Sequence, residues 1–521
     1  MKKVIKIFAC VLAVFLFITG CSSGKAPADA PVEQQPDANA GAASDVRTDL
    51  IIGMSTEPVT LNAQQSTNTG NARILCNVFD RLLDVDAENN LIPNLAESWS
   101  LSDDNLTYTF HLRQDIKFHN GDPLTADDVK YSFDGAIASG FFGEVTDLIA
   151  STEASDPHTF VLTLKSPCRL MLNYVAKNEY FDIVNSKLAT ERGEDLGVNI
   201  AGAGTGPYKF VEWQTGVGIT LEANEEYHRG APTLKNVTFK FIPEASAGAI
   251  ALETGDVDVY MDVSFVDVKN LESNSDLQVD IEMGRTHYYI CVNMTQPPFD
   301  DIRVRQALAY AVNLDEFVMG ALNGIGGVKT SNVVFPSSFG YSDKYPIREQ
   351  NIEKAKALLA EAGYPNGLDV TMITNDGQRK VSTETLQGML AQSGFNVTIE
   401  LVDTSAMGER IGSASFEAMV MNQLITSEDA GADMVEKLVS TVYGNFGRYN
   451  NPRVDELVRL GMEEQDEAKC LAYYDELQQI IYDELPIIPL YYGNLVTDAN
   501  VDLQGFRTRN DMLIYLPELS W

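Results

Sequence analysis

Histidine and cysteine are the side chains most able to bind metals or act as nucleophiles, and this chain has few of either. Cys10 and Cys21 lie near the N-terminus, and the other four cysteines are far apart, with no Cys-x-x-Cys pair: Cys76, Cys168, Cys291 and Cys470. The histidines show no paired metal-ligand spacing: His111, His119, His158, His228 and His287. We therefore predict no metal and no cofactor, and we expect these four cysteines to be mostly buried free thiols.

Catalytic motifs are also missing from the sequence. It contains neither Gly-x-Ser-x-Gly nor His-Glu-x-x-His, the spacings that place a nucleophile beside a base or two ligands on zinc. The glycine-rich stretch from Gly202 to Lys209 resembles a phosphate loop only superficially. It lacks the Gly-Lys-Ser/Thr ending, and Pro207 prevents the helix that should follow. We predict that the protein is not an enzyme, with a secreted hydrolase that uses Asp and Glu as a remote alternative.

The composition is that of a globular protein with a strongly acidic surface. It has 521 residues and a formal net charge of −36. Most of these carboxylates are expected to be solvated, and the charge argues against nucleic acid or an anionic bilayer as a direct partner.

The N-terminus predicts export. Three lysines precede an apolar run from Ile7 to Ile18, which is too short to span a bilayer and is typical of a signal peptide. The following Ile-Thr-Gly-Cys resembles a bacterial lipobox, which implies cleavage before Cys21 and a lipid on that residue. The alternative is an ordinary signal peptide with an incidental cysteine. The stretch after Cys21, rich in Ala, Pro, Gly and Ser, is predicted to be a flexible tether.

The stretch from Glu97 to Ala136 predicts a small folding unit. Apolar residues alternate with polar ones from Leu106 to Arg113, as in a strand with one buried face. A turn at Asn120-Gly121-Asp122-Pro123 follows, and Thr125 begins a helix with two aspartates in its first turn. Further upstream, a helix is predicted from Gly70 to Leu83.

This stretch, read as SDDxLTYTFHLRxxIKFHxGxPLTADDV, closely resembles the signature of the family 5 solute-binding proteins of bacterial ABC importers. The resemblance continues in the Gly-Thr-Gly-Pro-Tyr phrase that ends at Tyr208. It implies an α/β, two-lobed periplasmic-binding-protein-like fold of type II, with an extra subdomain in lobe I and a ligand cleft between the lobes. It also implies a monomer that delivers its ligand to ABC permease subunits in the membrane.

Alternating helices and strands between Ile352 and Met421 support a second α/β lobe. Combined with the resemblance, the pattern predicts these domains: a signal peptide over 1–20, a lipid anchor and tether over 21–46, lobe I over 47–288 with a subdomain at about 77–200, lobe II over 289–488, and a return to lobe I over 489–521.

Candidate ligand contacts come from the positions that match family phrases and from nearby aromatic residues. In the resembled family the loop after the first strand lies at the cleft, which implicates Thr56 and Glu57. Phe141 lies in a loop, where an aromatic residue could line a cleft or fix the loop to its own domain. Tyr491 and Tyr492 lie on the strand that returns to lobe I.

The most informative departure from the family follows the strand that ends at Met421. Many peptide-binding members have Gly-Trp-x-Ala-Asp-Tyr here, and the Asp binds the free amine of the peptide. This chain has Asn422 at the start of the phrase, Gln423 at the Trp position and Thr426 at the Asp position. Either Glu428 or Asp429 replaces that carboxylate by a shift in register, the ligand lacks a free amine there, or the loop is a variable turn.

The leading hypothesis is a lipid-anchored receptor that captures di- or oligopeptides outside the cell membrane and delivers them to a permease. The main alternative keeps the fold and the transport role but has a nickel chelate, a sugar or an opine as ligand. An adhesin or sensor would carry the same anchor and cleft.

Overall fold

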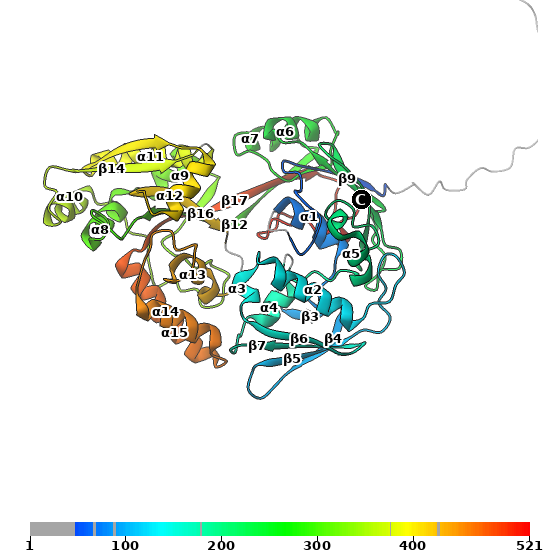
Figure 1. Ribbon diagram of the computed structural model, residues 1–521. Coiled ribbons are helices and arrows are strands. Elements are labelled where there is room, and N and C mark those ends of the chain that lie inside the picture. The colour runs from blue at the N-terminus through cyan, green and yellow to red at the C-terminus, as the bar shows by residue number, and fades with distance from the viewer. Residues whose placement is uncertain (1–46, 66–68, 87–89, 178–179, 376, 425–427) are drawn as a thin grey trace, which may run out of the picture. The chain divides into compact units, whose positions relative to one another are not determined.

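A mixed sheet of eleven strands, in the order β15-β14-β16-β12-β17-β11-β1-β10-β9-β8, connects the two halves of the protein, with β13 paired to β17 off this path. The computed structural model describes residues 47–65, 69–86, 90–177, 180–375, 377–424 and 428–521, and Arg47–Trp521 form one compact unit (Figure 1). The predicted signal peptide, Cys21 and the tether lie outside the described residues.

Two long antiparallel strands, β12 (Leu277–Val292) and β17 (Ile487–Asn500), run through both lobes (Figure 1). Their pairing shifts register between Met283 and His287. On one side of this irregularity β17 pairs with β11 of lobe I, and on the other side β12 pairs with β16 of lobe II. The predicted boundaries at 288/289 and 488/489 fall inside these two strands.

Lobe I has a mixed sheet, because β1 pairs in parallel with both β10 and β11 while β9 and β8 are antiparallel. Its strands are β1 (Asp49–Met54), β8 (Tyr208–Gln214), β9 (Gly218–Ala223), β10 (Asn236–Phe241) and β11 (Val259–Tyr260). Its helices are α1 (Thr69–Val78), α5 (Ser186–Arg192), the 3-10 helix η1 (Gly193–Gly197), α6 (Ala245–Glu253), α7 (Val268–Leu271) and η2 (Leu516–Glu518). Alternate residues of β1 and β10 are buried in the core of this lobe.

The subdomain of lobe I has its own antiparallel sheet, β4-β5-β7-β6, and its own core. Its strands are β2 (Leu83–Val85), β3 (Leu91–Pro93), β4 (Ala96–Leu101), β5 (Thr107–Leu112), β6 (Ile149–Asp156) and β7 (Thr159–Leu164). Its helices are α2 (Ala126–Ser139), α3 (Gly143–Thr146) and α4 (Met171–Ala176). The predicted alternation in β5 is confirmed, and Asp128 accepts a hydrogen bond from the Thr125 backbone N–H (3.0 Å), which fixes the start of α2.

The helix predicted over 70–83 is too long, because α1 ends at Val78. The Val78 carbonyl accepts from the Gly206 backbone N–H (3.0 Å), and the carbonyls of Arg81 and Leu82 accept from the chain that leads into β4. The backbone of this segment therefore pairs with other strands and turns, and these bonds replace the next helical turn.

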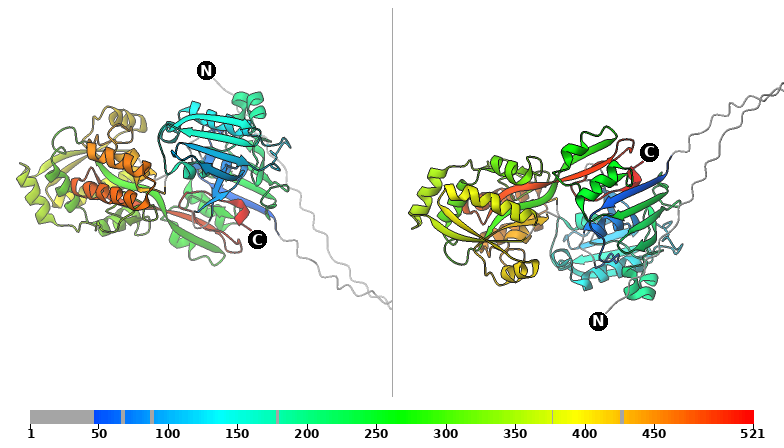
Figure 2. Two further views of the ribbon diagram at one scale, coloured as in Figure 1. Left: turned by 90° about the horizontal axis from the view of Figure 1, so that it is seen from below. Right: turned by 90° about the horizontal axis from the view of Figure 1, so that it is seen from above.

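Lobe II contains the alternating helices and strands that the sequence predicted. Its strands are β13 (Gly327–Lys329), β14 (Leu368–Thr374), β15 (Phe395–Leu401) and β16 (Ala418–Leu424). Its helices are α8 (Ile302–Ala311), α9 (Leu314–Leu322), α10 (Ile352–Glu361), α11 (Gln378–Gln392), α12 (Thr404–Gly412), α13 (Ala430–Leu438), α14 (Pro452–Glu463) and α15 (Glu467–Glu484). The strands β14 and β15 are parallel, and α14 and α15 pack side by side (Figure 2).

Candidate functional site

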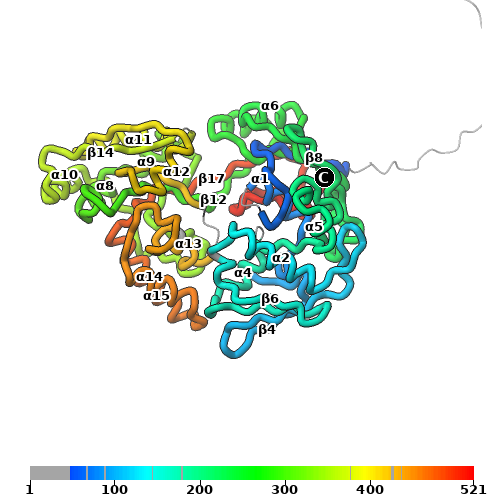
Figure 3. The backbone as a smooth tube through the Cα atoms, in the orientation of Figure 1, coloured from blue at the N-terminus to red at the C-terminus, as the bar shows by residue number. Residues whose placement is uncertain are grey.

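A cavity of about 250 Å³ lies on lobe I beside the crossing strand β17. Three segments form its walls: the chain after β11, the lobe I half of β17, and the C-terminal loop over 506–514 that follows β17. The C-terminal segment lies against α1 (Figure 3). Apolar side chains from all three segments line the cavity, including Val263, Phe265, Leu495, Phe506 and Leu513.

Arg73 of α1 holds these walls together. Its guanidinium donates to both carboxylate oxygens of Asp262 (2.9 Å each) and, through Nε, to the carbonyl of Met512 (3.1 Å). Met512 has a positive φ of 63°, a conformation that costs energy for a residue other than glycine. The buried arginine therefore fixes the C-terminal loop in the shape that closes the cavity.

Asp262 also joins the loop after β1 to the cavity. Its Oδ2 accepts from the backbone N–H (2.7 Å) and the hydroxyl (2.8 Å) of Ser55. Burial alone would raise the pKa of the Asp262 carboxyl, but Arg73 and the hydrogen bonds from Ser55 outweigh burial and hold the pKa below its usual range. Asp262 is thus a charged carboxylate whose charge is already balanced.

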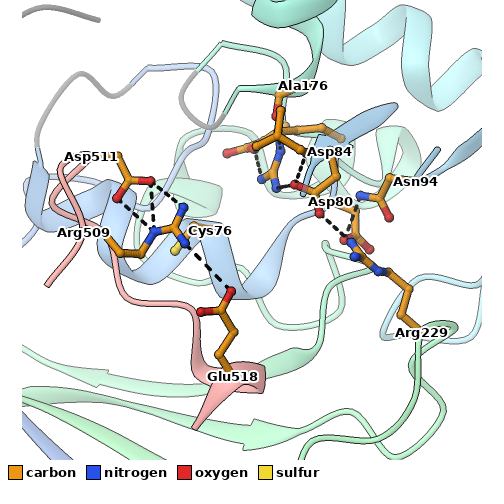
Figure 4. A network of polar contacts seen from close by, with 12 residues as sticks. Cys76, Asp80, Asp84, Asn94, Ala176, Arg229, Arg509, Asp511 and Glu518 are labelled. Atoms are coloured by element: carbon orange, nitrogen blue, oxygen red, sulfur yellow. Dashed lines mark hydrogen bonds and ion pairs between the residues drawn. The ribbon is translucent and has the colours of Figure 1, made fainter. Parts of the chain in front are cut away.

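A second cavity of about 520 Å³ is also lined by the C-terminal segment. Its charged groups pair with one another or with neighbouring residues (Figure 4). Arg509 binds Asp511 (3.0 Å) and approaches Glu518 (3.8 Å), while Arg81 and Arg229 both pair with Asp84. Arg509 lines both cavities. This network holds the segment that carries the cavity-lining loop.

A second buried arginine, Arg285, lies on β12 at the register shift of the crossing strands, and its partners belong to lobe II. Arg285 donates from Nη1 to Glu428 Oε1 (2.9 Å) and from Nη2 to the Ser338 hydroxyl (3.0 Å), and its guanidinium lies over the Phe335 ring. Glu428 keeps 38% of its side chain exposed, whereas Arg285 keeps 5%. Glu428 is therefore the accessible member of this ion pair.

Asp429 is fully buried and has three kinds of partner. It accepts from the backbone N–H of Gly431 at the start of α13 (2.8 Å), from the Tyr474 hydroxyl (2.6 Å), and from the guanidinium of Arg169. Arg169 belongs to the lobe I subdomain, so this ion pair connects the two lobes. Of the two carboxylates that the sequence left open, Glu428 is partly exposed and Asp429 is buried.

The other predicted contacts in lobe I lie near the cavity or at the surface. Thr56 is exposed and follows Ser55 directly. Glu57 accepts from Trp213 Nε1 (2.9 Å) and from the Gly216 backbone N–H, so its side chain holds the β8–β9 hairpin. Phe141 is exposed after the end of α2.

The other predicted contacts in lobe II are engaged by protein. Asn422 accepts from Arg379 Nε (2.8 Å), and Gln423 is buried and accepts from the Tyr289 hydroxyl. Tyr491 stacks on Tyr288, and Tyr492 donates to the Asn332 carbonyl (3.2 Å); both tyrosines are buried on the part of β17 that packs against lobe II. Thr426 lies outside the described residues. The part that these residues play in binding stays a prediction.

Sequence reasoning missed Arg73, Asp262, Arg285 and Arg509. One signal for Asp262 was available. Because β1 and β11 are parallel, the residues that follow them must meet at one edge of the sheet, which brings Asp262 to Ser55. No comparable signal pointed to Arg73, whose partner Met512 is 439 residues away in sequence.

The described residues contain no group of three His, Cys, Asp or Glu side chains able to hold a metal, and the four cysteines beyond the tether are buried free thiols, as predicted. Among the described helices, none combines the length and the apolar character needed to span a membrane.

Comparison with known proteins gives consistent matches. Residues 90–445 match the family model described as "Bacterial extracellular solute-binding proteins, family 5 Middle". The glutathione-binding protein GsiB of Escherichia coli (strain K12) is 28% identical over 473 residues, which cover 88% of this chain and 91% of GsiB. The oligopeptide-binding protein AppA of Bacillus subtilis (strain 168) is 27% identical over 552 residues, which cover 100% of this chain and 99% of AppA.

Two solved structures extend the similarity to three dimensions. The structure of AppA from Bacillus subtilis in complex with a nonapeptide aligns with a TM-score of 0.75 and 27% identity, covering 91% of this chain and 99% of that one. The structure of AgaA from A.tumefacien R10 in complex with agropinic acid aligns with a TM-score of 0.76 and 27% identity, covering 91% and 98%.

Proposed function

We propose that this chain, which belongs to family 5 of the bacterial extracellular solute-binding proteins, captures peptides outside the cell membrane and delivers them to the permease of an ABC importer. The observation that carries the proposal is the preorganised cavity beside β17, one of the two strands that connect the lobes, in a chain that matches AppA over its whole length. A site beside the interlobe strands can be covered when the lobes approach each other.

The rest of the proposal follows from the N-terminal sequence and the family. The signal peptide is removed, Cys21 carries the lipid, and residues 21–46 tether a monomeric body to the cell membrane. Lobe I extends over 47–288 and 489–521, and lobe II over 289–488. The protein catalyses no reaction, since binding and release are sufficient for delivery.

Glu428 is the residue that we propose to receive the ligand amine in place of a carboxylate at Thr426. It is accessible, and it lies in the loop after β16 where the family phrase places its own carboxylate. A ligand ammonium would compete with Arg285 for it, so the ligand must bring further contacts to make that exchange favourable.

The alternative function is transport of a non-peptide solute such as an opine, a sugar or a nickel chelate. Two observations favour it: the Trp and Asp of the peptide-binding phrase are replaced by Gln423 and Thr426, and a structural neighbour of the same fold holds agropinic acid.

Native mass spectrometry of residues 22–521, purified gently from the host, tests the proposal. A bound mass that fragments into amino acids is the expected result. A bound opine, sugar or metal chelate would overturn the peptide assignment and leave the family role in place. If the protein is purified empty, a screen of tripeptides by thermal shift decides, and failure of every peptide to stabilise it would count against the proposal.

A further inference from the structure

The size of the 250 Å³ cavity indicates that it holds part of a ligand. Pockets that enclose a whole small molecule usually measure about 300–1,000 Å³. An apolar cavity of about 150 Å³ is large enough to bind benzene. The cavity is therefore too small for an entire peptide and large enough for one side chain up to the size of a phenyl ring.

The walls favour an apolar group. Side chains from the chain after β11, from β17 and from the C-terminal loop supply apolar surface, among them Val263, Phe265, Leu495 and Leu513. Arg73 joins the chain after β11 to the C-terminal loop, and β17 is paired with β11 and β12, so little rearrangement is needed when a ligand enters.

The charged groups of the lining disfavour a charged guest. Asp262 already receives both terminal nitrogens of Arg73, and Arg507 and Arg509 are paired with Glu518 or Asp511. A lysine side chain would meet three guanidinium groups and no unpaired carboxylate among these lining residues. A glutamate would lose its hydration on entering the cavity, and it would find each of the three guanidinium groups already paired with a carboxylate.

We infer that this cavity is a specificity subsite that receives one apolar side chain, such as leucine, methionine or phenylalanine, from the bound ligand. The inference rests on the proposed function, because it takes the ligand to be a peptide. Leu495 is the residue to vary, since it lies on the sheet face of β17 and lines the cavity.

The test is a competition between tripeptides for the protein. The peptides have the forms Ala-Ala-X, Ala-X-Ala and X-Ala-Ala, with X as Ala, Leu, Phe, Trp, Lys or Glu. Native mass spectrometry measures how much of each peptide the protein retains. At one position the wild-type protein should retain Leu or Phe at least tenfold more strongly than Ala, because burying such a side chain is worth about one to two powers of ten in affinity. Lys and Glu at that position should bind no better than Ala.

Two variants of one residue should move this preference in opposite directions. L495W fills the cavity and should shift the preference toward Ala, whereas L495A enlarges it and should raise binding of Trp relative to Leu. V266W is the matched control, because Val266 is 71% exposed and does not line the cavity. Circular dichroism checks that each variant is folded.

The outcomes separate the inference from the proposed function. The subsite would be overturned if the protein retained peptides without any side-chain preference. It would also be overturned if the preference were unchanged in both Leu495 variants. Either result would leave peptide binding intact. Retention of no peptide by the wild-type protein would overturn the proposed function and the subsite with it.

Discussion

Asp433 is a buried carboxyl near the Arg285–Glu428 pair. Its Oδ2 accepts from the Ser338 hydroxyl (2.9 Å) and from the Phe335 backbone N–H (3.3 Å). Burial raises the pKa of the Asp433 carboxyl to about 6, because the nearby cations and these hydrogen bonds offset only part of the desolvation.

The stability of the protein should therefore depend on pH through Asp433. The folded protein binds the proton more tightly than the unfolded chain does, so the contribution is fully present below about pH 4 and is lost as the pH rises through about 6. Between pH 4.5 and pH 7.5 the wild-type free energy of unfolding should fall by about 2 kcal/mol relative to that of D433N. Urea unfolding at each pH measures both proteins.

Asp498 provides an independent comparison, since burial also raises the pKa of its carboxyl to about 6. D498N should show the same trend relative to wild type. Parallel stability curves for wild type and both variants would contradict this account of the two carboxyls.

The sequence predicts a ligand contact in the loop after β16, and the surroundings of the two carboxylates there depend on distant partners. The loop after β16 and its missing Trp and Asp were visible in the sequence. The arginine that pairs with Glu428 lies 143 residues away, and the arginine that pairs with Asp429 lies 260 residues away. Spacing within a loop carries no information about such partners, so the sequence could not show that Asp429 is buried in an ion pair while Glu428 stays partly exposed.

Among the elements, the turn before β8 is rich in glycine because it packs closely on another part of the backbone. A Cβ atom on Gly204 would lie 2.0 Å from the Val78 carbonyl oxygen, and one on Gly206 would meet the same group at 2.7 Å. These glycines let the turn pack directly on the end of α1.

G204A should lower the free energy of unfolding by about 2 kcal/mol or more, because backbone must move to admit the methyl group. The matched control is G388A in the middle of α11, where an added Cβ meets no atom within 4 Å. That change should raise stability by about 0.5–1 kcal/mol, because alanine is the better helix former. Urea unfolding compares both with wild type; equal effects of the two substitutions would show that the close approach to Val78 has no energetic role.

The elements with a regular pattern were predictable from sequence, and their ends were less so. Alternation identified β5, and the pattern of alternating helices and strands identified α10 and α11 of lobe II. The end of α1 was wrong because its last carbonyl is taken by Gly206, which is distant in sequence. Helix ends depend on which group satisfies the final carbonyls, and that group often belongs to another segment.

For the whole protein, the interlobe contact at Arg169 bears on how the two lobes move. Its guanidinium pairs with Asp429 and lies 4.2 Å above the Phe339 ring centre, and its backbone N–H donates to the Met462 carbonyl (3.0 Å). All three partners belong to lobe II, whereas Arg169 belongs to the lobe I subdomain. The contact therefore stabilises the arrangement in which the subdomain touches lobe II.

R169Q should weaken this arrangement without unfolding either lobe. Asp429 keeps the Tyr474 hydroxyl and the N–H groups of α13, so the loss is about 1–2 kcal/mol, below the 3–5 kcal/mol of a carboxylate left with no partner. A change of that size shifts the equilibrium constant between the arrangement in which the subdomain touches lobe II and one in which it does not by about tenfold. In small-angle X-ray scattering, ligand-free R169Q should have a larger radius of gyration than wild type.

R453Q is the control for this experiment. Arg453 pairs with Glu456 and Glu476 on the exposed surface of lobe II, so its loss removes an ion pair of similar type without touching the interlobe contact. Its scattering should match that of wild type. If R169Q also scatters as wild type does, the crossing strands β12 and β17 alone set the lobe arrangement, and Arg169 serves only to satisfy Asp429. If R169Q has a larger radius of gyration and a peptide restores the wild-type value, the ligand and the ion pair favour the same arrangement of the lobes. That result is expected for a receptor in which ligand binding brings the lobes together.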